Sequence, residues 1–445
     1  MRELVFPEPL FKYMHDELWK QRDIESAAVL LLNRDNHGTK TRFLVREVSL
    51  VPPELYERRT SNKVEIDSRF VAEMANRARK KSLSLCFVHT HVASLAARFS
   101  SVDDIGEGRL KAFLDRRMAG IEHLSLVLSQ NDVRGRLLGT TDEVVVTRVG
   151  TSLYKTFRND AAEYPVSSTS YDRQIRVFGE LGQRILETLT IGVVGVGGTG
   201  SSVIQSLAYL GVNHFILVDP DLVSETNLNR LIGATKQDVG KAKVAVAEAN
   251  ILTVQSGALI QTASDDVANP SVGKMLRDAD FIFCCTDTHG SRHVINQLTF
   301  QYLIPTIDMG VGIASAGGEV RRITGRVQML SPGLGCLACA NMLDPDAVRR
   351  DLQTAQVRNM DPYFIGEGEP APAVISINTT MASLAVTMFL SAVLGIPGQA
   401  RLQVYDGIRG TVRVATAEPI GGCVVCSTAG YLALGDSASL PEKVE

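Results

Sequence analysis

The sequence predicts an α/β protein with a doubly wound, mostly parallel sheet in its second half and a smaller α/β domain before it. Strands and helices alternate along the second half, which is the pattern of a parallel sheet covered by helices. Short apolar runs predict strands at Leu189–Val194, His214–Asp219 and Asp278–Cys285, and helices follow near Ser201 and over Lys243–Leu252. A glycine-rich turn joins the first of these strands to the first helix.

Length and composition narrow the classes of protein. The chain has 445 residues, of which 45% are hydrophobic, so two or three domains are expected. A formal net charge of -3 makes nucleic acid an unexpected partner. The apolar stretch Met381–Ile396 is shorter than the roughly 20 residues of a membrane span, so we predict a buried core helix and no membrane contact. The N-terminus lacks the apolar core of a secretion signal, which favours the cytoplasm.

Three segments are predicted along the chain: a first domain over 1–150, a linker over 151–169 and a second domain over 170–445. The linker contains the polar run PVSSTS. In the first domain, Leu10, Met14 and Leu18 recur every four residues, which predicts an amphipathic helix. A second helix is predicted over 66–80, with strands over 26–32, 42–51, 82–91 and 142–149.

The glycine turn predicts a nucleotide site. Its glycines allow close approach of the backbone to phosphate, and the helix that follows offers free N–H groups. Asp219 lies 19 residues after the last glycine, at the end of the second strand, where an acid binds a ribose hydroxyl. To this point an NAD-dependent oxidoreductase fits equally well. The turn contributes Gly195, Gly197, Gly198 and Gly200.

A run of charged and amide side chains after Asp219 favours a nucleoside triphosphate over NAD. Hydride transfer needs no such set of cations, whereas attack at phosphorus requires the phosphate charges to be neutralised. The run contains Asp221, Asn227, Arg230 and Lys243.

From Tyr171 onward the chain resembles the adenylyltransferases that activate ubiquitin-like proteins, including the ThiF-type enzymes that adenylate sulfur carriers. The resemblance rests on Tyr171-Asp-Arg173-Gln174, the glycine turn, the Asp-x-Asp…Asn-Leu-Asn-Arg run, Gly240-Lys-Ala-Lys243 and Cys285-Thr-Asp287-Thr-His-Gly-Ser-Arg292. It implies a Rossmann-like adenylation domain that uses ATP and Mg²⁺. The expected reaction is attack of a C-terminal carboxylate on the α-phosphorus of ATP, which gives an acyl adenylate and pyrophosphate.

The same resemblance assigns roles to single residues. Asp219 is expected to bind the ribose, and Gly197 to approach the nucleotide. Asp287 is expected to hold Mg²⁺, and Arg173 to reach the nucleotide from the partner subunit of a homodimer. Asn227, Arg230 and Lys243 are expected to hold the phosphates. Leu231 departs from the family, which usually has Gln at this place.

Two Cys-x-x-Cys pairs predict one structural zinc site. In a reducing compartment such pairs bind metal more often than they form disulfides. Four thiolates close the tetrahedral shell of Zn²⁺ and leave no open position, so the role is structural. The four ligands are Cys336, Cys339, Cys423 and Cys426.

The sequence contains no cysteine between Cys339 and Cys423, where many relatives carry the one that accepts the activated carboxylate. Either the reaction stops at the adenylate or an oxygen nucleophile forms an ester. Thr354 is the only Ser or Thr of the expected loop over 343–370. A solvated loop hydroxyl is its simpler interpretation.

The first domain carries a second metal motif. His89 and His91 share one face of a strand, and Asp103 follows with Ser100 three residues before it. Three protein ligands leave a fourth position for a water, as at catalytic zinc. Asp104 with Ser101 offers a second register. This His-x-His…Ser-x-x-Asp pattern resembles the JAMM metalloproteases, which implies that Glu25 handles the proton and that Ser100 supports the oxyanion.

We therefore predict a two-part enzyme of bacterial-type conjugation. Its second domain adenylates a ubiquitin-like or sulfur-carrier protein, and its JAMM-like first domain trims a precursor or reverses a conjugate. A conjugating enzyme is a candidate second partner. The alternatives are an activator of another peptide or small carboxylate with a metal-free docking domain, an NAD-binding oxidoreductase, and a scaffold without activity.

Overall fold

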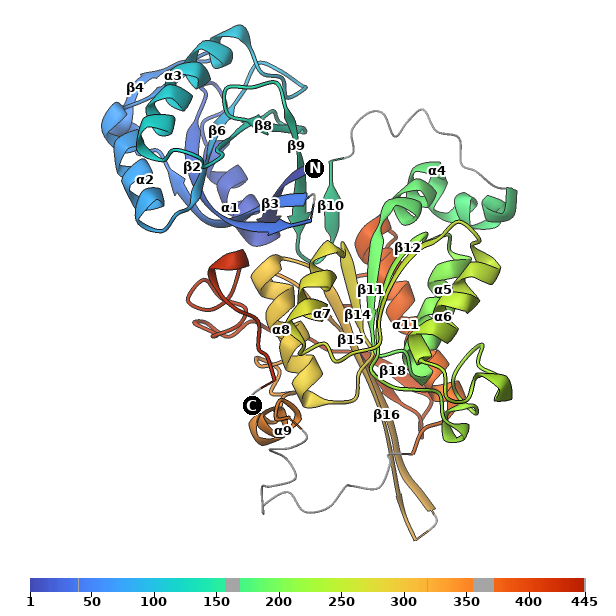
Figure 1. The fold of residues 1–445 in the computed structure, drawn as a ribbon. Coiled ribbons are helices and arrows are strands. Elements are labelled where there is room, and N and C mark those ends of the chain that lie inside the picture. Colours follow the sequence, from blue (N-terminus) through green and yellow to red (C-terminus); the bar gives the residue numbers. More distant parts are fainter. Residues whose placement is uncertain (39, 157–168, 318, 355–371, 444–445) are drawn as a thin grey trace. The chain divides into compact units, whose positions relative to one another are not determined.

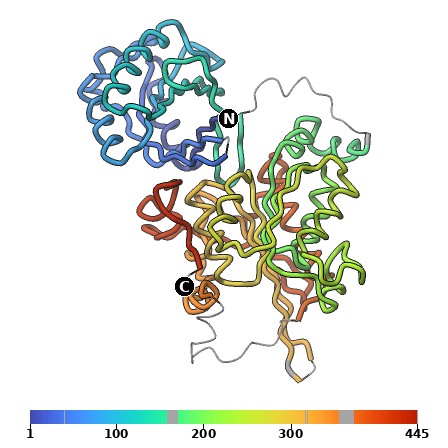
Figure 2. Tube along the Cα trace, viewed as in Figure 1, coloured from blue at the N-terminus to red at the C-terminus, as the bar shows by residue number. Residues whose placement is uncertain are grey.

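The computed structural model describes residues 1–445 except 39, 157–168, 318, 355–371 and 444–445 (Figure 1). The chain divides into two compact units. Unit 1 comprises Met1–Asn159, Gln301–Leu303 and Tyr431–Ser439, and unit 2 comprises Asp160–Phe300, Ile304–Gly430 and Leu440–Glu445. Figure 2 traces the backbone of both units in the colours of the sequence.

Unit 1 is built on a mixed eight-stranded sheet. The strand order is β1-β3-β2-β6-β7-β8-β9-β10, and β1 also pairs with β9, so the sheet closes on itself. The strands are β1 (Arg2–Pro7), β2 (Ala27–His37), β3 (Lys40–Leu50), β6 (Ser84–Thr90), β7 (Leu124–Leu128), β8 (Val133–Leu137), β9 (Glu143–Val149) and β10 (Leu153–Lys155). The last of these lies inside the predicted linker.

Both faces of the unit 1 sheet are apolar because helices cover each of them. On one face Leu30 and Val88 pack with Phe11 of α1 (Glu8–Leu18). On the other face Leu85 and Phe87 pack with α2 (Ser68–Lys80) and α3 (Ser101–Arg117). This second face also carries the small β4–β5 sheet, formed by Tyr56–Arg59 and Val64–Ile66. The parity of β6 therefore turns His89 toward the α3 side.

Unit 2 contains the predicted parallel sheet and extends it. The strand order is β13-β12-β11-β14-β15-β16-β17-β18, with the first five strands parallel and the last three joined antiparallel. The strands are β11 (Thr190–Val194), β12 (His214–Val218), β13 (Leu259–Ala263), β14 (Phe281–Cys284), β15 (Thr306–Ala316), β16 (Glu319–Leu330), β17 (Leu402–Asp406) and β18 (Thr411–Val414).

Helices cover both faces of this sheet, with α7 and α8 on one side and α5, α6 and α11 on the other (Figure 1). Rings of Phe281 and Phe283 on β14 pack against Phe389 of α11, with centroids 5.0 and 5.5 Å apart. The helices are α4 (Asp172–Thr188), α5 (Gly198–Tyr209), α6 (Lys243–Val254), α7 (Pro270–Met275), α8 (His289–Tyr302), α9 (Pro345–Asp351) and α11 (Ile375–Leu394).

The predicted core helix is α11. It is long and apolar enough to cross a membrane by length and composition alone. Its side chains Met381, Ala385 and Phe389 are nevertheless fully buried in unit 2. Burial within the protein accounts for its hydropathy.

Candidate functional site

The glycine turn between β11 and α5 requires glycine at several of its positions. Gly195 has φ +89°, and a Cβ there would lie 2.8 Å from the Cys285 backbone. A Cβ on Gly200 would lie 1.9 Å from the Gly195 oxygen. The turn therefore brings the end of β11, the end of β14 and the first turn of α5 into contact. The N-terminus of α5 offers N–H groups and a positive dipole end to an anion.

Asp219 and Lys243 lie beside this turn. The Val196 amide donates to Asp219 Oδ2 over 2.6 Å, and the Asp221 amide donates to Oδ1 over 2.9 Å. Lys243 Nζ lies 3.7 Å from Asp219 Oδ1 and 2.6 Å from Asp221 Oδ2. Burial raises the pKa of Asp219, and the Lys243 ammonium opposes that rise. The acid and the cation that the sequence predicts for ribose and phosphate thus share one corner of the sheet edge.

Arg230 approaches the turn from another direction. A Cβ on Gly198 would lie 3.4 Å from Arg230 Cγ and 2.2 Å from the Asn378 amide nitrogen. Arg230 Nη1 donates to the Thr226 carbonyl over 2.6 Å, which holds the side chain in place. Asn378 is a buried polar residue of α11 that sequence reasoning missed. An amide in a helix whose other polar residues are only Ser and Thr was the available signal.

Three other residues that the sequence predicts for the nucleotide site have surroundings different from those of Asp219, Lys243 and Arg230. Asn227 Oδ1 accepts from the Ser224 amide and so caps a short 3₁₀ turn. Asp287 is exposed just after β14, and its charge acts on Arg292. Arg173 is exposed on α4. Leu231, in place of the polar residue usual in the family, is 5% exposed and packs with Val223 and Val246 under the same loop.

A buried ionic cluster beside the β14 edge also escaped the sequence analysis. Asp308 on β15 is fully buried and lies opposite Cys284 of β14. Arg292 Nε donates to Asp308 Oδ1 over 3.2 Å, and Arg326 of β16 pairs with the other oxygen. Two guanidinium groups thus neutralise one buried carboxylate. Paired in this way, Asp308 ties α8 to the β15–β16 hairpin.

The four predicted zinc ligands converge in unit 2. Their sulfur atoms lie 3.5 to 3.7 Å apart for the pairs Cys339–Cys426, Cys336–Cys339 and Cys336–Cys423. These distances exceed a disulfide bond and match the edge of roughly 3.8 Å that Zn–S bonds of ~2.3 Å give in a tetrahedron. The Ile420 amide lies 3.3 Å from Cys339 Sγ, a backbone donor of the kind that supports thiolates.

The thiols of this cluster do not hold their protons equally. A hydrogen bond from the Cys426 thiol lowers the pKa of Cys336 below the ordinary value. The same bond raises the pKa of Cys426. A cation that replaces the shared protons would compensate the charge of all four thiolates, so the donor set fits Zn²⁺.

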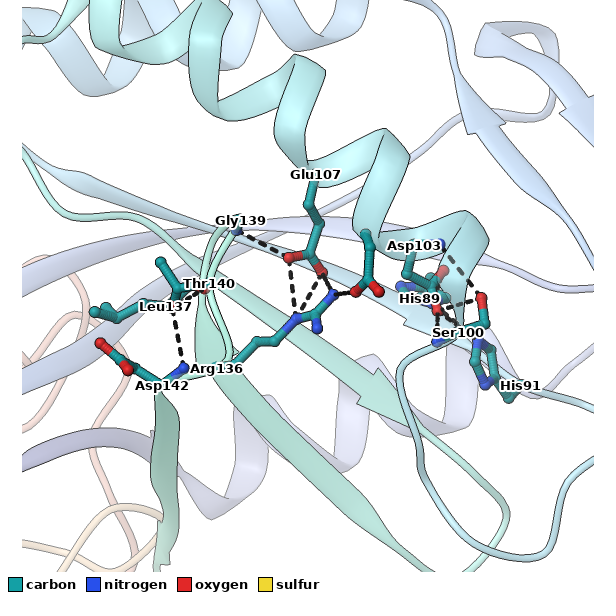
Figure 3. A network of polar contacts seen from close by, with 11 residues as sticks. His89, His91, Ser100, Asp103, Glu107, Arg136, Leu137, Gly139, Thr140 and Asp142 are labelled. Atoms are coloured by element: carbon teal, nitrogen blue, oxygen red, sulfur yellow. Dashed lines mark hydrogen bonds and ion pairs between the residues drawn. The ribbon is translucent and has the colours of Figure 1, made fainter.

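The motif of the first domain also assembles. His89 Nε2 and His91 Nε2 lie 3.1 Å apart, and they lie 3.2 and 3.5 Å from the two oxygens of Asp103. Burial opposes ionisation of Asp103, but hydrogen bonds from both imidazoles lower its pKa well below the ordinary value. The same carboxylate raises the pKa of His91. Three ligand atoms that point at one another form a fitting set for one cation (Figure 3).

The geometry decides between Asp103 and Asp104 as the carboxylate ligand. Asp103 faces the imidazoles, whereas Asp104 Oδ1 pairs with Arg136 Nη2 at 2.8 Å. Ser100 caps α3: its hydroxyl and its amide donate to Asp103 Oδ2 over 2.8 and 2.6 Å. In this structure Ser100 therefore orients the carboxylate of Asp103.

Glu25 lies in the wall of the same site. It is 5% exposed and lies just before β2, and burial raises its pKa while the imidazoles of His89 and His91 oppose that rise. A cavity of about 730 Å³ opens beside these residues. It continues between β5, α2 and α3 along Val64, Ile66, Val71, Leu110 and Phe113. The arrangement joins a cation site, a carboxylate of raised pKa and an apolar groove.

The expected loop over 343–370 is described only as far as Thr354. It begins with α9, whose Asp351 accepts from the Gly290 amide over 3.0 Å. Thr354 itself is partly exposed. The rest of the loop lies outside the described residues.

Comparison with known proteins finds a matching family and relatives for the second half of the chain. A model of the ThiF family matches residues 171–424. "Adenylyltransferase and sulfurtransferase MOCS3" of Caenorhabditis briggsae is 26% identical over 263 residues, which are 58% of this chain and 60% of that protein. "Adenylyltransferase and sulfurtransferase UBA4" of Meyerozyma guilliermondii is 32% identical over 150 residues, which are 33% of this chain and 35% of that protein. The chain spans less than two thirds of the length of these relatives.

A solved structure is similar to part of the chain. The crystal structure of E. coli MccB with ATP is 19% identical, covers 59% of this chain and 75% of that one, and has a TM-score of 0.47.

Proposed function

Because the chain belongs to the ThiF family, we propose that unit 2 transfers the adenylyl group of ATP to the C-terminal carboxylate of a ubiquitin-like or sulfur-carrier protein. The observation that supports this proposal most directly is that Asp219, Lys243 and Arg230 converge on the glycine turn. Relatives named adenylyltransferases support the same reaction class.

In the proposed reaction a carboxylate oxygen attacks the α-phosphorus of ATP, and the bond to the β-phosphate oxygen breaks. The products are an acyl adenylate and pyrophosphate. Arg230, Lys243 and the N-terminus of α5 offset the phosphate charge, and Asp219 accepts from the ribose. Asp287 is an exposed carboxylate at the same sheet edge and would hold Mg²⁺. The ion would further neutralise the phosphate charge.

Lys243 has an exposed carboxylate partner at the site, because its ammonium pairs with Asp221. A triphosphate carries more charge than one carboxylate and competes for this lysine. Asp221 thus keeps Lys243 close to the site until ATP arrives.

ATP–pyrophosphate exchange with candidate ubiquitin-like proteins tests this proposal. We expect Asp287→Ala to lower the exchange rate at least about 100-fold, because it removes one centre of charge stabilisation. Glu180→Ala removes an exposed carboxylate that forms a surface pair with Arg184, and it serves as the matched control. Equal exchange by both variants would contradict the proposal.

The same assay separates the alternatives. Exchange that needs only a small acid or a short peptide would favour an activator of another carboxylate. Preference for NAD over ATP in a binding measurement would revive the oxidoreductase. We further propose a cytoplasmic homodimer in which the exposed Arg173 serves the partner subunit, with release of the adenylate to a conjugating enzyme or to Thr354.

A second function is favoured by the cluster in unit 1. We propose that His89, His91 and Asp103 bind Zn²⁺ and that this JAMM-like site cleaves the chain that follows a ubiquitin-like C-terminus. Bound zinc would supply a water acidified toward neutral pH. Glu25, buried and of raised pKa, accepts and returns the proton. The apolar groove holds the extended tail of the substrate.

Both proposed chemistries act on the same flexible tail, which gives their fusion in one chain a purpose. Mass spectrometry of a C-terminally extended ubiquitin-like protein tests the cleavage. Glu25→Gln should abolish it while keeping the size of the side chain. Glu73→Gln, an exposed glutamate of α2, should leave it unchanged. Cleavage by Glu25→Gln at the wild-type rate would remove the role of this carboxylate.

A further inference from the structure

Arg136 is the centre of a buried ionic network that adjoins the zinc cluster of unit 1 without entering it (Figure 3). It lies on β8 and is 7% exposed. Its Nε donates to Glu107 Oε2 over 3.1 Å, and Nη2 lies 3.0 Å from Glu107 Oε1. The Gly139 amide donates to the same carboxylate over 3.0 Å. Glu107 thereby joins α3 to β8 and to the turn that follows β8.

This network holds the part of α3 that carries Asp103. Asp103 and Glu107 are four residues apart, so they lie one above the other on the same side of the helix. Arg136 also pairs with Asp104, at 2.8 Å. The guanidinium of Arg136 therefore fixes Asp104 and Glu107, two carboxylates close to the ligand Asp103 on α3.

Hydrophobic packing does not hold this half of the helix. Glu107 and Leu114 are the only buried residues of α3, which is described throughout. In its first turns Val102 is 50% exposed and Ile105 is 61% exposed. Gly106 faces open space and weakens the helix by up to about 1 kcal/mol relative to alanine. The ionic network is what anchors this end.

Arg136 reaches the segment before α3 as well. Its guanidinium lies 3.8 Å from the ring centroid of Phe99, the residue before the helix cap Ser100. A planar guanidinium can stack on a ring and bind a carboxylate with two nitrogens at once, which a lysine ammonium cannot do. The contacts of Arg136 therefore bracket Asp103 on both sides along the chain.

We propose that Arg136 is a positioning residue for the metal site of unit 1, because it fixes Asp103 through Phe99, Asp104 and Glu107. This inference rests on the zinc site proposed above. Without Arg136 the two imidazoles stay at the end of β6, His89 within the strand and His91 just after it, while the third ligand moves with a loosened helix end. The metal then binds more weakly although each ligand is intact.

Zinc titration against a chelator, on the full chain with the Cys₄ site loaded, tests the proposal. Arg136→Lys keeps the charge and should weaken the exchangeable site about 10- to 100-fold, the usual cost of losing support to a ligand. Arg134→Lys is the matched control: the same change on the same strand, at an exposed arginine 3.6 Å from Glu143. It should leave zinc affinity unchanged. Co²⁺ absorption spectra should change for Arg136→Lys alone.

The outcomes are separable. If the wild type binds no second zinc, the proposed zinc site fails and the role of Arg136 fails with it. If the wild type binds and Arg136→Lys binds as tightly, only the positioning role is wrong, even where the melting temperature falls. If Arg136→Lys does not fold, Glu107→Gln tests the same link with a smaller change, and unaltered zinc affinity in that variant overturns the proposal.

Discussion

The Cys₄ cluster of unit 2 and the His–His–Asp cluster of unit 1 both gather metal-ligating atoms, yet they differ in ligand number and access. Four sulfurs, with three of their pairs 3.5 to 3.7 Å apart, would leave a bound cation no open position. The other cluster offers three ligands and borders a cavity of about 730 Å³. The number of protein ligands, more than their chemical type, separates a site suited to holding the fold from one suited to catalysis.

The largest expected effect is on the closed site. Cys336→Ser should release its zinc and destabilise unit 2 by at least about 3 kcal/mol, since metal binding contributes directly to folding. That corresponds to a fall in melting temperature of roughly 6–12 °C. Circular dichroism measures it. Trp19, the only tryptophan, lies in unit 1, and its fluorescence should report little change there.

A buried cysteine outside the cluster provides the control. Cys284→Ala removes a fully buried thiol of β14 and should cost about 1 kcal/mol. If Cys336→Ser were no more destabilising than Cys284→Ala, the cluster would not be a structural metal site.

A second effect concerns the strand that carries the open site. His123 Nδ1 accepts from the Leu85 amide of β6 over 3.1 Å, and burial lowers the pKa of His123 to about 4. The unfolded chain takes up this proton near pH 6.5, so stability is full above that pH and is lost as pH falls toward 4. We expect a loss of about 2 kcal/mol between pH 8 and pH 5.

Urea unfolding followed by Trp19 fluorescence measures this loss. The difference between wild type and His123→Gln isolates the contribution of His123, and the variant should show the flatter pH profile. Identical profiles for wild type and His123→Gln would show that this group does not titrate as stated.

The smallest expected effect on stability comes from the open site. Asp103→Ala removes one ligand and the partner of the Ser100 cap, so it should cost only about 1 kcal/mol. Metal analysis should nevertheless fall from two zinc ions per chain to one. A wild-type count of one, or a count of two in the variant, would break the comparison between the two clusters.

The sequence predicts regular elements and spacing-encoded sites well, for physical reasons. Apolar alternation and the glycine turn locate β11, α5 and the face of β6 that carries His89, because both are local properties of the chain. The Cys-x-x-Cys pairs are local as well, although only the fold brings Cys336 and Cys423 within 3.7 Å. The closure of the unit 1 sheet through β1 and β9 depends on long-range pairing that no local pattern encodes.

The residues that sequence reasoning missed all act through distant partners. Asn378 lies 180 positions from Gly198, and Arg136 reaches α3 from β8. A buried amide or ion pair looks like a surface residue in the sequence until its partner is known. The choice between Asp103 and Asp104 as the carboxylate ligand depends on distant partners in the same way, because Asp103 meets the imidazoles while Asp104 pairs with Arg136.

The central claim is that one chain both exposes and activates the same C-terminal tail. Pyrophosphate exchange should therefore be measured with one ubiquitin-like protein in two forms, mature and C-terminally extended, for wild type and Glu25→Gln. We predict exchange by the wild type with both forms, and by Glu25→Gln with the mature form only. The account would be contradicted if Glu25→Gln exchanged as fast as the wild type with the extended form. It would also be contradicted if neither enzyme supported exchange with either form.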